Sequence, residues 1–575
     1  MRNGVKALLV LLSLASGYEQ YLIRLSQLSA SSVMLAGVYL LILTALSCAL
    51  LGAAFIPRSL VRWTYAIVFA AAAVFWDTNL RVTGEFTTYD TFVSQLDAFS
   101  FVNEALSHYW LSIGIAAVTA SLLLVGIGLK PGGARPPLRS MPSGWLATPP
   151  LVALLLLTAM LFARGGDGGR GVPSTYIPLA YLNLFAYEYL TASVGPREPV
   201  RLPHTGARPT HDIVLIIDES VSGNYLDLNT PQGVPTPLTR PPVDVRVHNF
   251  GYAASITNCS AGVNYNLRFG GTREDYARMN ARMPSIWQYA KLAGLQTVFV
   301  DAQRTGGMLI NRMTEEERKE IDRWIQFDGV QVRDRDMATA GTLIDLLADD
   351  TPQFIYVNKM GAHFPVHDKA PDAFVRYRPA LPRGRYDDVS DTGLRFGLGD
   401  SPEDWTLYRN SYRNTLLWTV GEFFTRLIGS GQLDRGVIIY TSDHGQNLHE
   451  RGDPGFATHC SPNPVMEEGL VPLVVLHGAA TQTLDWSRHL QENRDRSSHF
   501  NIFPSLLQMM GYELDALQAV YGRPLTVPTD DPFTFNIKFN ARLGSPPKWT
   551  YIDLQRIVMP PADSGEKTSA SDSSR

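Results

Sequence analysis

Long apolar runs fill the first 165 residues of the chain, whereas the rest alternates short apolar runs with polar segments. A membrane-spanning helix needs about 20 mostly apolar residues. An early run starts at Val5 but is interrupted by charges at Glu19 and Arg24, and Trp63–Trp76 reaches this length only with its flanking residues. The clearest runs are Val33–Ile56, Trp63–Trp76, Trp110–Leu129 and Trp145–Phe162. The pattern predicts a transmembrane domain of about five helices over residues 1–164.

Positive charges set the expected orientation, because cytoplasmic loops are enriched in Lys and Arg. They precede the first helix, and they lie between helices two and three and between helices four and five: Arg2, Lys6, Arg58, Arg62, Lys130, Arg135 and Arg139. With the N-terminus in the cytoplasm, five spans place everything after Arg164 outside it. An even number of spans would reverse this, and a signal peptide over Met1–Gly17 is the competing interpretation of the first run.

Two further segments fit a membrane surface. Residues 84–106 mix aromatic and aliphatic residues with acids and amides, which is typical of an amphipathic helix on the outer surface, although a solvated loop is the alternative. Residues 165–210 form a linker that begins with glycines and ends with prolines. Within this linker, Tyr176–Val194 is rich in Tyr, Leu and Phe and predicts an interfacial helix.

From His211 onward the pattern predicts an α/β domain with a largely parallel central sheet. Short buried runs alternate with helical segments; the runs are Ile213–Ile217, Thr297–Val300, Phe354–Val357, Val437–Tyr440 and Leu470–Leu476. We assign residues 211–527 to this catalytic domain. Residues 528–575 form an extension with two possible strands, Phe533–Phe539 and Trp549–Leu554, and a Ser/Asp/Lys-rich tail from Pro561 that we expect to be disordered.

Composition excludes several classes of protein. The chain has 575 residues, with 50 Lys and Arg against 54 Asp and Glu, so its net charge of −4 gives no support to a nucleic-acid binder. It has only 3 cysteines, Cys48, Cys259 and Cys460, which exclude a disulfide scaffold and a cysteine-rich zinc module.

Polar residues at the ends of the predicted strands suggest a metal site. Glu219 follows the first strand, Asp443-His444-Gly445 follows a later one, His363 lies after the strand ending at Val357, and His459 lies further along. In parallel sheets, ligands bind outside the carboxyl ends of the strands. Carboxylates and imidazoles together suit Zn²⁺. The alternative is that each is an ordinary polar residue or a helix cap.

The order of these residues along the chain resembles the motif order of the phosphoethanolamine transferases of the alkaline phosphatase/sulfatase superfamily. The resemblance spans most of residues 211–515, and the helix count extends it to the N-terminus. It rests mainly on Ser442-Asp-His-Gly445, and further on Gly361-Ala-His-Phe-Pro365, Val234-Pro-Thr-Pro-Leu238, Asn410-Ser-Tyr-Arg-Asn-Thr415 and Ser498-His-Phe-Asn-Ile-Phe503. The family has five membrane helices and a zinc-dependent periplasmic domain, which implies a multi-pass protein of the bacterial inner membrane that modifies lipopolysaccharide or another envelope component.

The resemblance also implies roles for individual residues. The nucleophile would be Thr257, which precedes Ser260 with the family's spacing, and Ser255 and Ser260 are the other candidates. Zinc would be bound by Glu219, Thr257, Asp443 and His444.

In the implied reaction, phosphatidylethanolamine would donate phosphoethanolamine through a phosphothreonine ester to an envelope lipid or glycan. His363 and His459 would hold the phosphate or bind a second zinc ion.

Other functions remain open from the sequence. A phosphoglycerol transferase would use the same residues. A sulfatase would need Cys or Ser in the pattern Cys/Ser-x-Pro-x-Arg, and Cys259-Ser-Ala-Gly-Val263 lacks the Pro and the Arg. A membrane-anchored binding protein is a third alternative.

The few cysteines in the catalytic domain distinguish the chain from lipid A-modifying relatives and favour a different acceptor. If Thr257 and His459 approach one phosphate, Cys259 and Cys460 approach each other and can form a disulfide; two buried free thiols are the alternative.

Overall fold

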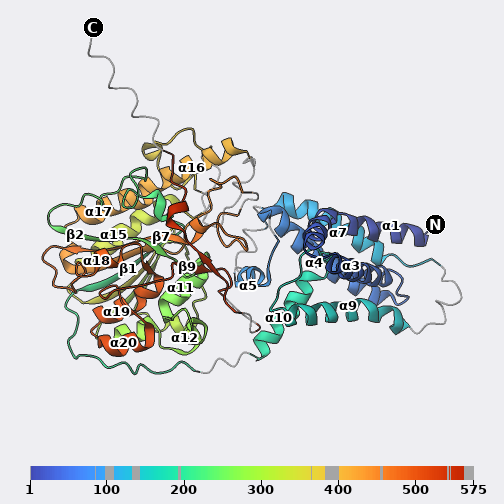
Figure 1. The fold of residues 1–575 in the computed structure, drawn as a ribbon, viewed down its shortest axis with the longest axis horizontal. Coiled ribbons are helices and arrows are strands. Elements are labelled where there is room, and N and C mark those ends of the chain that lie inside the picture. The colour runs from blue at the N-terminus through green and yellow to red at the C-terminus, as the bar shows by residue number, and fades with distance from the viewer. Residues whose placement is uncertain are drawn as a thin grey trace, which may run out of the picture. The chain divides into compact units, whose positions relative to one another are not determined.

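The computed structural model describes residues 2–84, 86–97, 106, 109–132, 143–191, 196–363, 366–382, 401–453, 457–539, 543 and 546–561. The chain divides into two compact units, shown in Figure 1. The first comprises Met1–Ser193 with Ala541–Pro546, and the second comprises Val194–Asn540 with Pro547–Arg575. The predicted boundary at residue 164 therefore falls inside the first unit, which also takes in most of the predicted linker.

The first unit is helical. Its described helices are α1 (Arg2–Ala15), α2 (Tyr18–Ser31), α3 (Val33–Ala53), α4 (Ser59–Thr83), α5 (Tyr89–Asp97), α7 (Trp110–Gly128), α9 (Ser143–Ala163) and α10 (Ile177–Thr191). All the predicted apolar runs are helical, and α10 lies within the segment expected to form an interfacial helix. The first run breaks at Ser16 and Gly17 into α1 and α2. Helix α5 covers part of the predicted amphipathic segment, whose remainder lies largely outside the described residues.

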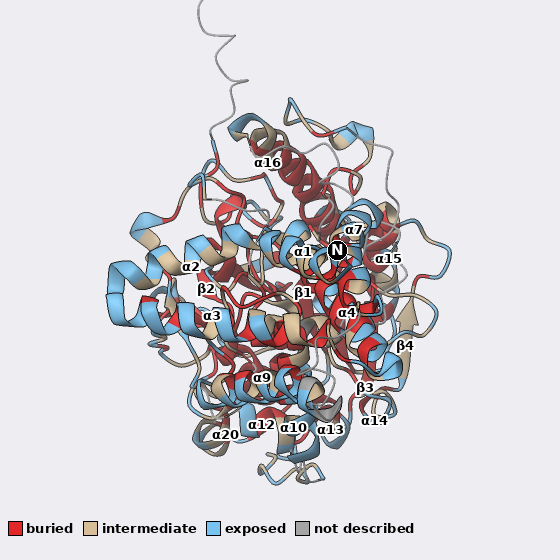
Figure 2. Cartoon of the chain, turned by 90° about the vertical axis from the view of Figure 1, so that its right-hand side faces the viewer, coloured by how far each residue is buried: buried red, intermediate tan, exposed pale blue. Residues whose placement is uncertain are grey.

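Three of these helices are long and apolar enough to cross a membrane: α3, α4 and α7. A shorter apolar helix covers Ala147–Ala163. Large apolar side chains are exposed on these helices: Val33 and Leu41 of α3 and Leu60 of α4 are 84%, 72% and 81% exposed. Figure 2 shows much of α3 in the colour of exposed residues. Such surfaces suit a lipid environment. The prediction of five spans is therefore not confirmed, because three helices among the described residues meet these criteria.

Basic residues gather at one end of the helical unit. Lys6 Nζ donates to the carbonyl oxygens of Gly126 at 2.7 Å and Ile127 at 3.0 Å. Arg62 Nε donates to Gly128 O at 3.1 Å. These carbonyls end α7 and have no partner within the helix, so cations there complement its dipole.

A different set of residues meets near the start of α3. Tyr39 Oη donates to Gly171 O at 2.9 Å, and the Arg24 side chain packs on Gly171. The segment that follows α9 therefore lies beside the first half of α3. Arg62 marks the opposite end of this helix, because it donates to Ile56 O just beyond the end of α3.

The second unit contains an eight-stranded sheet with the order β4-β3-β5-β1-β6-β7-β2-β8. The strands are β1 (Asp212–Asp218), β2 (Val245–Ala254), β3 (Gln296–Asp301), β4 (Arg323–Gln326), β5 (Gln353–Asn358), β6 (Gly436–Ser442), β7 (Leu470–Gly478) and β8 (Ser497–Ser498). Strand β1 pairs in parallel with β5 and β6. Strand β7 runs antiparallel to both β6 and β2. The sheet is therefore mostly parallel, as the buried runs predicted.

Helices cover both faces of this sheet (Figure 1). One hydrophobic core packs α15 (Arg335–Leu347), α16 (Pro402–Leu416) and α17 (Phe423–Gly429) on one face. The other core packs α11 (Ser260–Phe269), α13 (Ile286–Leu292), α19 (Ile502–Met509) and α20 (Leu514–Tyr521) on the opposite face. The described part of the unit also contains α12 (Tyr276–Arg282), α14 (Glu315–Arg318) and α18 (Leu490–Asn493).

The C-terminal extension forms the two predicted strands as a separate small sheet. Strands β9 (Thr534–Asn536) and β10 (Trp549–Tyr551) pair antiparallel. The predicted tail after Pro561 lies outside the described residues.

Candidate active site

Glu219, Asp443 and His444 meet at the carboxyl ends of β1 and β6. One ligand atom from each lies within 4.8 Å of the others, and all three side chains are buried. Parallel pairing brings Asp218 opposite Ser442, so the residues that follow each strand must be neighbours. The sequence predicted these three as metal ligands, and the structure brings them together.

Backbone groups fix the Asp443 carboxylate. Oδ1 accepts hydrogen bonds from the amides of Ser220 at 2.9 Å and His444 at 2.7 Å. Oδ2 is buried and has no hydrogen-bond partner among the described residues. It lies 3.6 Å from His444 Nε2. A buried carboxylate oxygen without a donor calls for a cation.

His444 and Glu219 are oriented in the same way. His444 Nδ1 lies 2.7 Å from Gly445 O, which makes Nδ1 the protonated nitrogen and leaves the lone pair on Nε2. Glu219 accepts from Ser220 Oγ at 2.8 Å and from Gln303 Nε2 at 3.1 Å. The tight turn depends on Gly445, because a Cβ there would lie 2.1 Å from Glu467 O.

Burial disfavours the charged forms of all three groups. It raises the pKa of Asp443 to about 6 and, with help from the Asp443 charge, raises the pKa of Glu219. Burial also lowers the pKa of His444. A bound divalent cation would offset the cost for the two carboxylates by favouring their ionised forms, and it would favour the same neutral imidazole that burial favours. The three residues therefore fit a metal ion of the zinc type.

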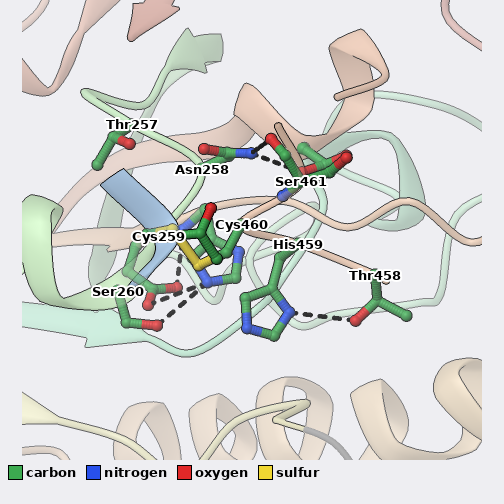
Figure 3. The surroundings of a disulfide bond; sticks show 12 residues. Thr257, Asn258, Cys259, Ser260, Thr458, His459, Cys460 and Ser461 are labelled. Atoms are coloured by element: carbon green, nitrogen blue, oxygen red, sulfur yellow. Dashed lines mark hydrogen bonds and ion pairs between the residues drawn. A yellow bond between two sulfur atoms is a disulfide. The ribbon is translucent and has the colours of Figure 1, made fainter. Parts of the chain in front are cut away.

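Among the candidate nucleophiles, Ser260 has its hydroxyl within hydrogen-bond distance of these residues. It begins α11, and its Oγ lies 3.2 Å from Glu219 Oε1 and 3.2 Å from His444 Nε2 (Figure 3). Thr257 is buried three residues earlier, and Figure 3 shows it apart from Ser260. Its carbonyl oxygen accepts from Ser255 Oγ at 2.9 Å. The arrangement therefore favours Ser260, the other candidate of the predicted spacing, over Thr257.

His363 and His459 complete the site. The His459 ring stacks on that of His444 with centroids 4.6 Å apart, and His363 lies 6.4 Å from His459. Both are half-buried and come from loops. The structure thus places His459 next to His444 and His363 next to His459, whereas their predicted role in holding phosphate stays a prediction.

A disulfide joins Cys259 to Cys460, with Cα atoms 4.9 Å apart, and confirms the pairing that the sequence suggested (Figure 3). It connects the residue before Ser260 to the residue after His459. The backbone adds a hydrogen bond from Cys460 N to Asn258 O at 2.8 Å. Asn258 Nδ2 in turn donates to Glu468 Oε2 at 2.7 Å.

Sequence reasoning missed two residues beneath the site. Gln303 orients Glu219 and also donates to Lys359 O at 2.8 Å. Lys359 is fully buried, and its Nζ lies 2.6 Å from Asp218 Oδ2. Burial raises the pKa of Asp218 to about 6, although the Lys359 ammonium counteracts part of this shift. The only sequence signal for either residue was its position just after a predicted strand.

The chain is similar to known proteins both in its family and in its fold. A family model described as sulfatase matches residues 211–512. The integral membrane lipooligosaccharide phosphoethanolamine transferase A of Neisseria meningitidis is similar in structure, with 16% identity, a TM-score of 0.64, and coverage of 91% of this chain and 99% of that chain.

Periplasmic or soluble domains of two such proteins also match. That of EptC from Escherichia coli has 16% identity, a TM-score of 0.45, and coverage of 59% and 93%. That of the Neisseria meningitidis protein has 18% identity, a TM-score of 0.44, and coverage of 58% and 99%. No curated protein matches the sequence.

The family model covers more than half of the chain and includes Glu219, the Ser260 helix, His363, Asp443, His444 and His459. The structural match covers both the helical unit and the α/β unit, and it shows that the fold of this chain is similar to that of the neisserial protein. The chain therefore belongs to the sulfatase family and is an enzyme of the alkaline phosphatase superfamily.

Proposed function

We propose that the protein transfers phosphoethanolamine from phosphatidylethanolamine to an envelope lipid or glycan, with Ser260 as the covalent nucleophile. One observation carries this proposal: the Ser260 hydroxyl lies at the start of a helix, within hydrogen-bond distance of two of the three candidate metal ligands. Neisserial phosphoethanolamine transferase A, which shares the fold, supplies the substrate class.

Glu219, Asp443 and His444 would hold zinc beside Ser260. When bound, zinc lowers the pKa of a nearby hydroxyl and neutralises phosphate charge. The Ser260 oxygen then attacks the phosphorus of the donor. As the Oγ–P bond forms, Ser260 gives up its hydroxyl proton to solvent, the bond from phosphorus to the diacylglycerol oxygen breaks, and that oxygen takes up a proton from solvent. A serine phosphoethanolamine ester remains until an acceptor hydroxyl or phosphate displaces Ser260.

The surrounding residues suit the transferred phosphate. The N-terminus of α11 presents amide groups and a positive dipole end to an anion held on Ser260. His459 and His363 lie beside His444, where they hold phosphate oxygens, and a second zinc ion bound by them remains the alternative. Cys259 is bonded to Cys460, so its thiol is not free for conversion to a formylglycine.

The contacts of the helical unit support five membrane crossings. The α1–α2 pair has Lys6 at the end where α7 finishes, and Arg24 at the end where Gly171 follows α9. We infer that α1 and α2 together make one crossing and that α9 makes the last. The end of the helices that carries Lys6 and Arg62 then lies in the cytoplasm, and the catalytic unit lies in the periplasm, anchored in a bacterial inner membrane.

Lipid turnover tests the proposal. The full-length protein is incubated with zinc and headgroup-labelled phosphatidylethanolamine in detergent, and diacylglycerol is measured. We expect release that stops on chelation and in Ser260→Ala, but continues in Thr257→Val, which keeps the shape of the buried side chain. Turnover of phosphatidylglycerol instead would favour a phosphoglycerol transferase. Sulfate release from sulfate esters, without lipid turnover, would contradict the proposal.

A further inference from the structure

A buried carboxylate lies between the segments that carry Ser260 and His459. Glu468 Oε2 accepts a hydrogen bond from Asn258 Nδ2 at 2.7 Å and another from Ser461 N at 3.3 Å. Asn258 lies two residues before Ser260, and Ser461 lies two residues after His459. Asn258 Nδ2 also donates to Ser461 O at 3.1 Å (Figure 3). These three hydrogen bonds form a closed triangle among Asn258, Ser461 and Glu468, which we call the clasp.

Glu468 also contacts the turn that carries a candidate metal ligand. Its carbonyl oxygen accepts from Gly445 N at 3.0 Å, and Gly445 directly follows His444. Its second carboxylate oxygen, Oε1, accepts from Val465 N at 3.3 Å. Glu468 lies two residues before β7, which pairs with β6, the strand that ends just before Asp443. The clasp is therefore attached to the same end of the sheet that presents the candidate metal ligands.

The clasp is shielded from water. Asn258, Ser461 and Glu468 are 1%, 4% and 0% exposed. A buried polar group needs partners, and removal of one partner leaves the others buried and unsatisfied. Hydrogen bonds are also directional, so they fix how two segments lie relative to each other, whereas apolar contacts do not. The clasp therefore favours one arrangement of the Ser260 segment and the His459 segment.

A second link joins the same two segments. The Cys259–Cys460 disulfide holds its Cα atoms 4.9 Å apart, and its cysteines are the sequence neighbours of Asn258 and Ser461. Cys460 N also donates to Asn258 O at 2.8 Å. Two links between the same segments are coupled, because each raises the effective concentration of the groups that form the other. The clasp should therefore favour the disulfide, and the disulfide should favour the clasp.

We propose that Glu468 is a positioning residue, which through the clasp sets the place of His459 relative to Ser260 and keeps it when the disulfide is reduced. The inference rests on the proposed function, in which Ser260 carries the transferred group and His459 holds its phosphate. Misplacement of a reacting group by about 1 Å can lower a rate by about 100-fold. Loss of the clasp should therefore slow the reaction without releasing the metal.

The thiol–disulfide equilibrium tests the clasp without using the reaction. Full-length protein in detergent is equilibrated with glutathione buffers and quenched with acid, and the Cys259–Cys460 bridge is quantified on peptides. We expect Asn258→Ala or Glu468→Gln to lower the effective concentration of the two thiols by about tenfold or more, because each change removes a hydrogen-bonding group of the clasp. Asn493→Ala, the matched control, removes a similarly buried amide that donates to carbonyl oxygens elsewhere, and it should leave the equilibrium unchanged.

Kinetics on the same variants test the positioning role. With phosphatidylethanolamine and saturating zinc, Asn258→Ala or Glu468→Gln should lower kcat for diacylglycerol release by about 10- to 100-fold, while KM and zinc content stay at wild-type levels. In a His459→Ala background the same changes should lower kcat by less than about threefold, because the group that they position is gone. A purely structural role would instead give equal losses in both backgrounds.

A measurement on the unaltered protein avoids any folding defect of the variants. After reduction by a phosphine, the wild type should keep its kcat within about tenfold, since the clasp still joins the two segments. A reduced wild type as slow as His459→Ala, equal losses in both backgrounds, or an unchanged equilibrium in both clasp variants would each overturn the proposal. Absence of lipid turnover in the wild type would instead overturn the proposed function, and the glutathione equilibrium would still decide whether the clasp joins the segments.

Discussion

The inner and outer halves of the active site are held in different ways. Glu219, Asp443 and His444 are fully buried at strand ends and are fixed by hydrogen bonds from neighbouring backbone and side chains. His363 and His459 are half-buried on loops, and a disulfide fastens the residue after His459. The contrast fits the proposed function, in which the rigid half would bind the metal and hold the nucleophile, and the accessible half would contact the phosphate and the acceptor.

The largest effect should come from breaking the rigid half. Asp443→Asn or His444→Ala should weaken zinc binding at the catalytic centre by at least about 100-fold and abolish lipid turnover, because each removes one of three protein ligands. Zinc titration against a competing chelator measures this, with folding checked by circular dichroism. Unchanged zinc affinity in both variants would show that Asp443 and His444 do not bind zinc.

Loss of the nucleophile should leave the metal in place. Ser260→Ala should lower diacylglycerol release by about 1,000-fold or more while zinc content stays at the wild-type level. Thr257→Val, the matched control, should keep most of the activity. The reverse pattern would return the nucleophile to Thr257.

Changes in the accessible half should be milder. His459→Ala or His363→Ala should reduce kcat by about 100-fold, as expected for loss of one group that stabilises transition-state charge. Zinc at the inner ligands should be retained, and steady-state kinetics with metal analysis measures both. If either variant releases one of two catalytic zinc ions, that histidine is a ligand of a second zinc.

The disulfide should matter more for stability than for chemistry. Cys259→Ser with Cys460→Ser should lower the free energy of unfolding by about 2–5 kcal/mol, because the bridge closes a loop with a sequence separation of 201 residues. Activity of the remaining folded protein should fall less than in His459→Ala. Denaturant titration and activity assays measure these effects, and a loss of activity equal to that of Ser260→Ala would show that the bridge is needed to place the nucleophile.

The smallest effect concerns the metal-free protein. Burial raises the pKa of Asp443 in the folded protein to about 6. Ionising Asp443 therefore lowers the stability of the folded protein as the pH rises from the pKa of an Asp in the unfolded chain towards 6. Asn cannot ionise, so above pH 6 the free energy of unfolding of metal-free Asp443→Asn should be about 1–3 kcal/mol larger than that of the metal-free wild type. The advantage should vanish below about pH 4. Thermal unfolding with chelator across this range checks the sign.

Much of this architecture was predictable from local pattern. Apolar runs predicted the helices α3, α4, α7 and α9, and short buried runs predicted β1, β3, β5 and β6. Strand β2 was missed because its half-buried, polar-rich start, Val245–Asn249, lacks a continuous apolar run. The break between α1 and α2 at Ser16 and Gly17 was hard to predict, because a single glycine is the only helix-breaking residue there.

The grouping of Glu219, Asp443 and His444 was predictable because Glu219 and the Asp443-His444 pair follow neighbouring parallel strands. The choice between Thr257 and Ser260 was not, since both lie on one short segment and only the start of α11 decides which hydroxyl faces Glu219. Gln303 and Lys359 act through contacts between strands that are distant in sequence, and no local spacing encodes such contacts.

Mapping the covalent intermediate tests the central claim most directly. Full-length protein loaded with zinc is mixed with phosphatidylethanolamine in the absence of acceptor, quenched with acid and digested, and the peptide containing both hydroxyls is fragmented by mass spectrometry. We expect a phosphoethanolamine adduct on Ser260 that is absent from Asp443→Asn. An adduct on Thr257, or turnover of lipid with no adduct on either residue, would contradict the assignment.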